Sequence, residues 1–301
     1  MDQRFENYRS EMINLITSRY ELNGAVQSEI PNLDFYFSKE LTEQINIMYE
    51  PSLCVILQGD KAVGFGENNY GYDHKMYLLS STHLPAKMKI LKASNETPYI
   101  SLRIKFTLEN IYEVLKALDS QQTNLDENAE KGLFFDDMNI QLYESLYRFM
   151  KLLERSKKDI EFLYPLLTKE ILYNLVKSQG GAFLSKFCME GSVSNKIVQV
   201  ITYIKDHFNE KLNINTLAKS IDMSESSLYQ HFKTITTLSP IQFQKKLRLE
   251  EAKRLLQLQN KEISEVAFAV GYESPSQFSR EFSRMFGLSP KAFANLRIEG
   301  V

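Results

Sequence analysis

Two stretches near the carboxyl end of the chain carry the same pattern of apolar and polar residues, fifty positions apart. The first, 224–240, reads SESSLYQHFKTITTLSP, and the second, 274–290, reads SPSQFSREFSRMFGLSP. In the first copy Leu228, Phe232 and Ile235 recur at i, i+4 and i+7, the spacing of one apolar helix face. A pattern that recurs at a fixed offset indicates one structural unit used twice.

Each copy is predicted to be a pair of short helices joined by a tight turn. The first helix of each pair is predicted over 215–221 and over 263–270, with the second turn at Gly271. The second helix of each pair follows a good start signal, because Ser224 is a favoured N-cap and Pro275 suits a first helical turn. Two short helices, the second with a polar outer face, describe a helix-turn-helix.

The second copy also carries a recognisable signature. VAFAVGYESPSQFSREF at 266–282 and FGLSP at 286–290 closely resemble the DNA-binding domain of AraC/XylS-type bacterial transcription regulators, over about the last hundred residues. The resemblance implies two helix-turn-helix units joined by a long helix, here predicted over 241–259. It also implies a sequence-specific regulator whose partners are double-stranded DNA and RNA polymerase.

The same resemblance implies which residues contact DNA. In such domains the outer face of each recognition helix contacts base edges, and here those positions are Ser226, Tyr229, Gln230, Ser276, Gln277 and Arg280. Arg280 has the best chemistry, since a guanidinium can bond guanine O6 and N7 together, and Gln230 could pair with adenine. The phosphate-contact candidates are Lys233, Lys245, Lys246 and Arg284. The alternative for each of these cations is an ordinary solvated side chain.

The two copies differ at their turns. Asp222 stands where the family usually has glycine, and Thr237 stands where the second copy has Gly287. Asp tolerates left-handed backbone better than most residues, so the first turn is expected to survive. The first unit is therefore predicted to be the less ideal of the two.

The N-terminal half has a different pattern, with short apolar runs separated by turn residues. Strands are predicted at 53–59, 62–66, 70–72, 76–80, 88–92 and 99–106. Breaks between them are predicted at 67–69, 73–74, 84–85 and 95–98. Many short strands at close spacing favour a small antiparallel barrel or sandwich. An amphipathic helix is predicted before them, over 1–20.

This half resembles the N-terminal effector domain of one AraC/XylS subgroup. The residues that carry the resemblance are YEPSLCVILQGDK at 49–61, YLLSS at 77–81, Leu84-Pro85, and the A-S, P-Y and L-R-I words within 93–104. The resemblance extends over 10–300. It implies an α+β chain in which a cupin-like barrel with accessory helices binds a small organic effector, but it does not say which residues contact that effector.

Helical spacing returns between the barrel and the repeat. Helices are predicted over 108–118, 140–154 and 164–178, the last beginning at Pro165 and stopped by Gly180-Gly181, with a polar loop over 121–131. These helices either pack on the barrel or form the face of a homodimer, and both alternatives stay open. The short polar stretch 191–194 is expected to join two domains, 1–190 and 195–301, with the second opening on a helix over 196–208.

Charge and composition refine this picture only slightly. From Lys196 onward 15 Lys and Arg stand against 11 Asp and Glu, a net charge of +4, while the remainder carries −6. A basic C-terminal domain fits phosphate contact, although ordinary variation could give the same difference. The sequence shows no signal peptide and no apolar run of membrane-spanning length, and its two cysteines make no disulfide framework. We therefore expect a cytoplasmic protein without membrane contact.

Enzymatic use of the barrel is not expected. Metal-dependent cupins use a His-x-His pair, whereas the N-terminal histidines here are His74 and His83, so no metal, cofactor or catalytic residue is predicted. Cys54, in an apolar strand, is more typical of a small buried hydrophobe than of a reactive thiol. Two rivals remain: a cupin enzyme fused to a DNA anchor, and a regulator that uses its barrel only to dimerise. A barrel core filled by side chains would favour the second rival, whereas an open apolar pocket of roughly a few hundred Å³ would favour effector sensing.

Overall fold

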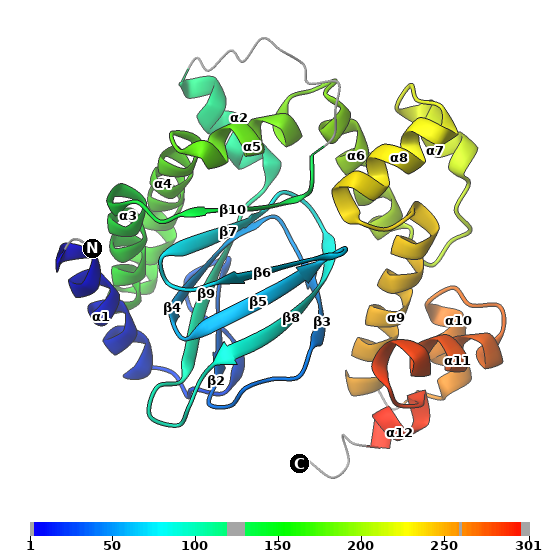
Figure 1. The fold of residues 1–301 in the computed structure, drawn as a ribbon, viewed down its shortest axis with the longest axis horizontal. Helices are drawn as coiled ribbons and strands as arrows, with labels where there is room; N and C mark the ends of the chain where they lie inside the picture. Colours follow the sequence, from blue (N-terminus) through cyan, green and yellow to red (C-terminus); the bar gives the residue numbers. More distant parts are fainter. Residues whose placement is uncertain (1–2, 119–129, 259–260, 296–301) are drawn as a thin grey trace. The chain divides into compact units, whose positions relative to one another are not determined.

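The computed structural model describes residues 3–118, 130–258 and 261–295 of the chain (Figure 1). The chain divides into an N-terminal unit, Met1–Lys196, and a C-terminal unit, Ile197–Val301. The polar loop predicted over 121–131 lies outside the described residues except for its last two positions. Within the described part of the chain, no helix is both long and apolar enough to span a bilayer.

Antiparallel strands build the body of the N-terminal unit (Figure 1). One sheet has the order β1-β2-β9-β4-β7-β10, with bounds Gly24–Gln27, Leu33–Ser38, Tyr99–Lys105, Ser52–Gln58, Met76–Ser80 and Leu133–Asp137. The other has the order β3-β8-β5-β6, with bounds Ile45–Tyr49, Leu84–Lys92, Asp60–Phe65 and Asn68–Tyr72. The two sheets enclose a barrel-like interior, which confirms the predicted fold class. β1, β2, β3 and β10 have no counterpart among the predicted strands.

The burial of each strand follows from what covers its faces. β2 and β5 alternate buried and partly exposed residues, as expected for strands with one face toward a core. β4 is buried from Ser52 to Leu57, because it lies inside the larger sheet and the first helix covers its outer face. Arg9 of that helix donates from Nη1 to the carbonyl oxygen of Leu57 at 3.0 Å.

Two predicted breaks between strands are wrong. The break predicted over 67–69 lies at 66–67, because Asn68 and Asn69 already belong to β6. Leu84 and Pro85 begin β8 instead of interrupting the sheet, and Pro85 lies opposite Met48 of β3. β5, the neighbour on the other side of β8, pairs with it only from Lys87 onward. Proline is tolerated at the first residues of a strand, where its missing N–H leaves no ladder bond unmade.

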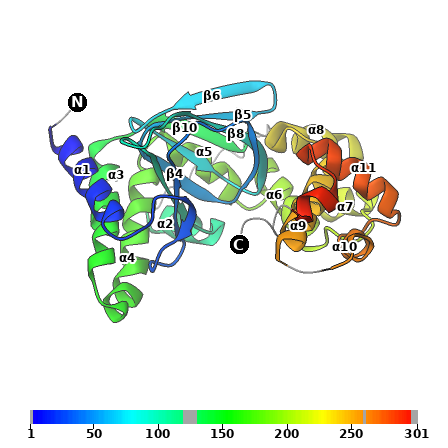
Figure 2. The same ribbon diagram turned by 90° about the horizontal axis from the view of Figure 1, so that it is seen from below.

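Helices cover the outside of the barrel, and Figures 1 and 2 both show α1, α3 and α4 side by side. The bounds are Gln3–Thr17 for α1, Leu108–Ala117 for α2, Ile140–Met150 for α3, Lys157–Val176 for α4 and Gln179–Cys188 for α5. A short 3-10 turn, Lys151–Glu154, follows α3. The predicted apolar stripe of α3 and this turn is confirmed, since Leu142, Leu146, Phe149 and Leu153 are all buried.

The predicted start of the fourth helix is wrong, whereas its end lies within two residues of the predicted one. α4 starts seven residues earlier than predicted, at a capping box in which Ser156 accepts from the Asp159 amide, and Pro165 lies inside it. Gly180 and Gly181 do not stop α4 but lie in the first turn of α5. A Cβ at Gly181 would approach the carbonyl oxygen of Val176 to 1.9 Å, so glycine permits the close junction of the two helices.

The described part of the C-terminal unit is helical. Its helices are α7 Ile214–Ser220, α8 Glu225–Thr236, α9 Pro240–Leu258, α10 Ile263–Ala269, α11 Pro275–Phe286 and α12 Pro290–Asn295, while α6, Val193–Asp206, contains the division between the two units. The predicted helices of this region are confirmed to within a few residues, and α12 is an addition. A core cluster joins α9, α10 and α11 through residues such as Leu256, Val266 and Phe282.

Candidate functional site

The repeated sequence folds into two helix-turn-helix units, α7 with α8 and α10 with α11 (Figure 1). In each turn one residue adopts left-handed backbone, Asp222 with a φ of 53° and Gly271 with a φ of 87°. The following amide, of Met223 or Tyr272, donates back to the helix at 2.9 Å in both copies. The left-handed conformation expected for Asp222 is therefore confirmed. A Cβ at Gly271 would lie 2.2 Å from the carbonyl oxygen of Asn209, so that turn requires glycine.

Both second helices start and end in the same way. The Ser224 hydroxyl accepts from the Ser227 amide at 3.2 Å, and the Ser274 hydroxyl accepts from the Gln277 amide at 3.3 Å. These N-caps satisfy backbone donors that a helix cannot bond internally. The C-caps are Thr237 and Gly287, both left-handed. The inner faces are buried through Leu228, Phe232 and Ile235 in α8 and through Phe278 and Phe282 in α11.

The outer faces of α8 and α11 carry the predicted base-contacting residues. Five of the six are exposed, namely Ser226, Gln230, Ser276, Gln277 and Arg280, whereas Tyr229 is half-buried. Arg280 makes no hydrogen bond or ion pair with another described residue. The side-chain amide of Gln277 donates from Nε2 to Oε1 of Glu281 at 3.2 Å. Three of the predicted contacts thus gather on each helix, and the exposed ones can reach a ligand without unfolding.

Among the phosphate-contact candidates, Lys233 and Arg284 are exposed and Lys246 is half-buried. Lys245 is exposed but forms an ion pair with Glu281 at 3.0 Å. Burial opposes ionisation of Glu281, but hydrogen bonds from Tyr272, Lys245 and Gln277 outweigh it and hold its pKa below the usual range. Glu281 therefore orients two of the predicted DNA contacts, an arrangement that the sequence did not reveal.

Arg248, in the middle of α9, links three segments of the C-terminal unit through hydrogen bonds. Its guanidinium donates to the carbonyl oxygens of Phe208 and Gly271, both at 2.7 Å, and to that of Glu210 at 2.8 Å. Charged donors make stronger bonds to carbonyl oxygens than neutral donors do. Arg248 therefore fixes the turn of the second helix-turn-helix against both α9 and the segment after α6.

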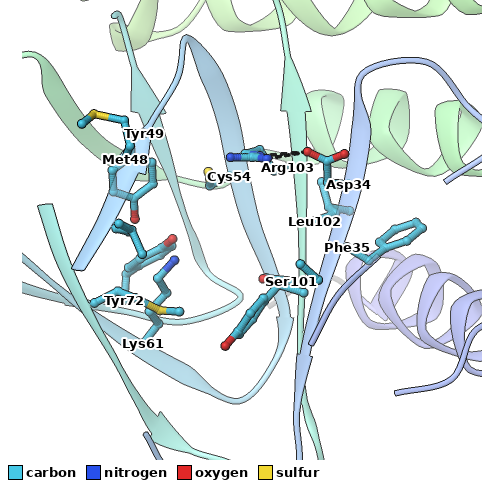
Figure 3. Close-up of a pocket in the computed structure, with 14 residues that line it drawn as sticks. Asp34, Phe35, Met48, Tyr49, Cys54, Lys61, Tyr72, Ser101, Leu102 and Arg103 are labelled. Atoms are coloured by element: carbon cyan, nitrogen blue, oxygen red, sulfur yellow. Dashed lines mark hydrogen bonds and ion pairs between the residues drawn. The ribbon is translucent and has the colours of Figure 1, made fainter. Parts of the chain in front are cut away.

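A cavity of about 190 Å³ lies inside the barrel of the N-terminal unit (Figure 3). Both sheets contribute to its lining, which consists of Ala25, Asp34, Phe35, Tyr36, Ile47, Met48, Tyr49, Cys54, Lys61, Tyr72, Met88, Ser101, Leu102 and Arg103. Most of these side chains are apolar or aromatic, and a few are charged or polar. An apolar pocket with a small number of fixed polar groups is the usual form of a small-molecule site.

One charged pair in this cavity is fully engaged. Asp34 and Arg103 are directly opposite each other on β2 and β9. Arg103 donates to Oδ2 of Asp34 from Nε at 3.1 Å and from Nη2 at 2.5 Å, and Lys105 lies 3.3 Å from the same oxygen (Figure 3). The carboxylate of Asp34 is therefore already balanced by two cations.

The other cation of the cavity is Lys61, which sequence reasoning did not single out. On β5 it shares the inward face with Val63 and Phe65, and only 9% of its surface is exposed. Its ammonium lies 5.6 Å from the centre of the Tyr49 ring. Burial lowers the pKa of Lys61 and raises that of the neighbouring Cys54 thiol. The signal that could have identified Lys61 is its position two residues before Val63 and four before Phe65, on the apolar face of an alternating strand. Within the described residues, no cluster of three or more His, Cys, Asp or Glu could hold a metal ion.

Two family models match the chain. The family described as AraC-type transcriptional regulator N-terminus matches residues 29–183, and the family described as helix-turn-helix domain matches residues 217–295. The first match spans more than half of the chain.

Curated relatives match about a third of the chain. The probable transcriptional regulator LumQ of Photobacterium leiognathi is 32% identical over 97 residues, which are 32% of this chain and 39% of LumQ. The HTH-type transcriptional activator RhaS of Salmonella newport is 31% identical over 105 residues, which are 34% of this chain and 38% of RhaS. The chain spans about two fifths of the length of these relatives.

Solved structures resemble most of the chain. ToxT from Vibrio cholerae has a TM-score of 0.60 at 12% identity, with 88% of this chain and 97% of ToxT covered. A ToxT structure with an unsaturated fatty acid bound has the same TM-score and identity and covers 91% of this chain. At this identity the likeness concerns the fold, and it extends over both the barrel and the helical region.

Proposed function

Because the chain belongs to the AraC/XylS family of transcription regulators, we propose that it is a bacterial regulator that reads specific sequences in double-stranded DNA and responds to a small organic effector. The observation that carries this proposal is the duplicated helix-turn-helix, in which both second helices are capped alike and present exposed polar faces. Side chains on such faces can reach base edges in the major groove.

In this proposal α8 and α11 are the recognition helices. Ser226, Tyr229 and Gln230 contact bases from α8, and Ser276, Gln277 and Arg280 contact bases from α11. Lys233, Lys245, Lys246 and Arg284 contact phosphates, which fix the position of the protein on the duplex without specifying sequence. The two helices enter successive major grooves about 34 Å apart, with bending of the DNA where both engage at once.

The barrel serves as the effector domain. Its cavity of about 190 Å³ supports sensing over a barrel that is filled by side chains and used only for dimerisation. ToxT, which shares this fold, has been solved with an unsaturated fatty acid and with a naphthalenyl-butenoic acid bound. We assign no catalytic role to the barrel.

Two further parts of the proposal concern partners and place of action. Phe162, Leu166 and Tyr173 form a stripe on α4 and are 74%, 57% and 43% exposed, which supports a homodimer face on that helix. By analogy with its family, the DNA-bound regulator contacts RNA polymerase in the cytoplasm.

The proposal is tested by sequence selection. Purified full-length protein is incubated with a pool of randomised 30-base-pair duplexes, and bound duplexes are recovered, amplified and sequenced over several rounds. We expect two short enriched segments whose centres lie about 10 base pairs apart, on one face of the helix. Footprinting of the enriched duplex should then show protection over both segments. Binding that remains indifferent to sequence after selection would contradict the proposal.

A further inference from the structure

We propose that Lys61 receives the acid group of the effector, and that the barrel cavity takes a small monocarboxylate with an apolar body. This inference deepens the proposed function, and it rests on that function only for the statement that the bound molecule is a regulatory effector. Three features of the cavity support it: an unpaired ammonium, a surplus of hydrogen-bond donors, and a limited volume.

Lys61 is a buried cation without a counter-ion. Its side chain lies inside the barrel at 9% exposure, and its ammonium has no hydrogen bond or ion pair with any residue that the structure describes. The face of the Tyr49 ring, 5.6 Å away, offers a cation–π contact that offsets only part of the lost hydration. Isolated buried charges are unfavourable unless they are paired. An anionic ligand would supply the missing partner.

The nearest carboxylate cannot play that part. Asp34 already receives two bonds from Arg103 and lies 3.3 Å from Lys105. Figure 3 shows this pair on the other side of the cavity from Lys61. The cavity lining therefore carries one acidic and two basic side chains, and its excess positive charge is located at Lys61.

A second unsatisfied group lies in the same cavity. The Tyr49 hydroxyl is buried and has no hydrogen-bond partner among the described side chains and backbone. Figure 3 shows Tyr49, Tyr72 and Lys61 together on one side of the pocket. Phenolic hydroxyls at neutral pH are donors, and burial raises the pKa of Tyr49 well above its ordinary value. An ammonium and a phenol that both need an acceptor match the two oxygens of a carboxylate.

The cavity limits the size of the rest of the ligand. A cavity of roughly 150 Å³ holds one benzene molecule, so about 190 Å³ holds a ring or a six-carbon chain with one carboxylate attached. Ile47, Met48 and Met88 supply apolar contacts for that body, and methionine adapts its shape easily. A long-chain fatty acid exceeds this volume.

The inference is tested by titration calorimetry on the full-length protein with two acids and their neutral counterparts, benzoate with benzamide and hexanoate with hexanamide. We expect at least one acid to bind with a Kd below about 1 mM and its amide to bind at least tenfold more weakly. Lys61→Met should weaken binding of the acid tenfold or more, whereas Lys61→Arg should restore part of it. The matched control is Lys89→Met, at an exposed position of β8 opposite Ala62, which should bind like the wild type.

A thermal unfolding measurement shows whether the Lys61→Met protein still folds. Removal of an unpaired buried ammonium should raise the Tm of the ligand-free protein, so a folded variant with lost acid binding supports the inference. The inference is overturned if neither acid binds, if acid and amide bind equally, or if Lys61→Met binds the acid as the wild type does. DNA binding is measured in parallel by gel shift on the selected duplex. Failure of acid binding with intact sequence-specific DNA binding removes only this inference, whereas the reverse result removes the proposed function.

Discussion

Arg280 and Lys233 are matched exposed cations with different proposed roles in DNA binding. Arg280 lies on the exposed face of α11 that is proposed to read bases, and it makes no hydrogen bond or ion pair with the rest of the described structure, so it is available to a guanine edge. Lys233 lies near the end of α8, on an exposed position. Because both side chains are exposed, alanine at either position should leave the fold intact.

Arg280→Ala and Lys233→Ala should therefore have different effects on DNA binding. Arg280→Ala should weaken binding to the selected duplex by about 1–3 kcal/mol and relax base preference at one position. Lys233→Ala should weaken binding evenly across sequences and flatten the dependence of affinity on salt. Fluorescence anisotropy at several salt concentrations, on the selected duplex and on single-base variants, measures both effects. An unchanged affinity for Arg280→Ala, or a loss for Lys233→Ala confined to one sequence, would count against these roles.

Single residues also show where sequence reasoning stops. The outward positions of α8 and α11 could be predicted from helical spacing, because the residues that define each helix face all lie within that helix. Asp34 and Arg103 lie 69 positions apart, and only the register of β2 with β9 brings them together. In the sequence, Lys61 was only the last residue of the segment 49–61 that resembles the family. Its inward direction could not be predicted, because it depends on which face of β5 turns toward the barrel interior.

At the scale of elements, the C-caps of α8 and α11 give an internal comparison. Thr237 has a φ of 66° and Gly287 a φ of 77°, so the same left-handed cap is made by a β-branched residue in one copy and by glycine in the other. A β-branched side chain in this conformation is strained by roughly 1–3 kcal/mol. Glycine removes this strain but loses roughly 0.5–1 kcal/mol through extra freedom in the unfolded chain.

Thr237→Gly should therefore raise the free energy of unfolding of the C-terminal unit by about 0.5–1 kcal/mol. Gly287→Thr is the matched reverse change, and a Cβ there meets no described atom within 4 Å, so it adds backbone strain without a clash. It should lower stability by about 1–2 kcal/mol. Urea unfolding of full-length protein, followed by far-ultraviolet circular dichroism, compares the three chains. A Thr237→Gly protein that is less stable than the wild type would show that cap strain is absent.

The helix boundaries around α4 show which local signals can mislead. Pro165 was interpreted as a helix start and Gly180-Gly181 as a helix stop, although both lie inside helices. The true start was present in the sequence as a capping box, Ser156 with Asp159 three residues later. The glycines serve close packing against the end of α4, which is a tertiary requirement that no local pattern expresses.

At the scale of the whole molecule, the exposed stripe on α4 is expected to join two copies of the chain. Leu166→Glu places a charge in the middle of the stripe and should convert a dimer into a monomer. The control is Leu41→Glu, since Leu41 is similarly exposed, at 60% against 57% for Leu166, but lies outside α4. Both variants should change stability by less than about 0.5 kcal/mol. Sedimentation velocity measures the mass of each protein, and a wild-type monomer at every concentration would contradict the prediction.

The general architecture was accessible from sequence because its two halves have different periodicities. Short apolar runs separated by turn residues favoured a barrel before 106, and helical spacing with a repeat favoured paired helices after 196. The edges of the barrel were not accessible. β10 pairs with β7 through contacts such as Leu133 with Ser80, across a long stretch of intervening chain, and its own five residues carry no clear strand pattern.

The length of α9 has a consequence for the DNA sequences that the proposed function requires. The helix has 19 residues and contacts both α8 and α11, while Arg248 locks its middle to the second unit. Inserting one residue into α9 would rotate one helix-turn-helix relative to the other by about 100° around the helix axis. Under the proposed function, the two DNA segments contacted by α8 and α11 must therefore keep one fixed phase on the duplex. Lengthening the spacer between them by half a helical turn should abolish simultaneous binding.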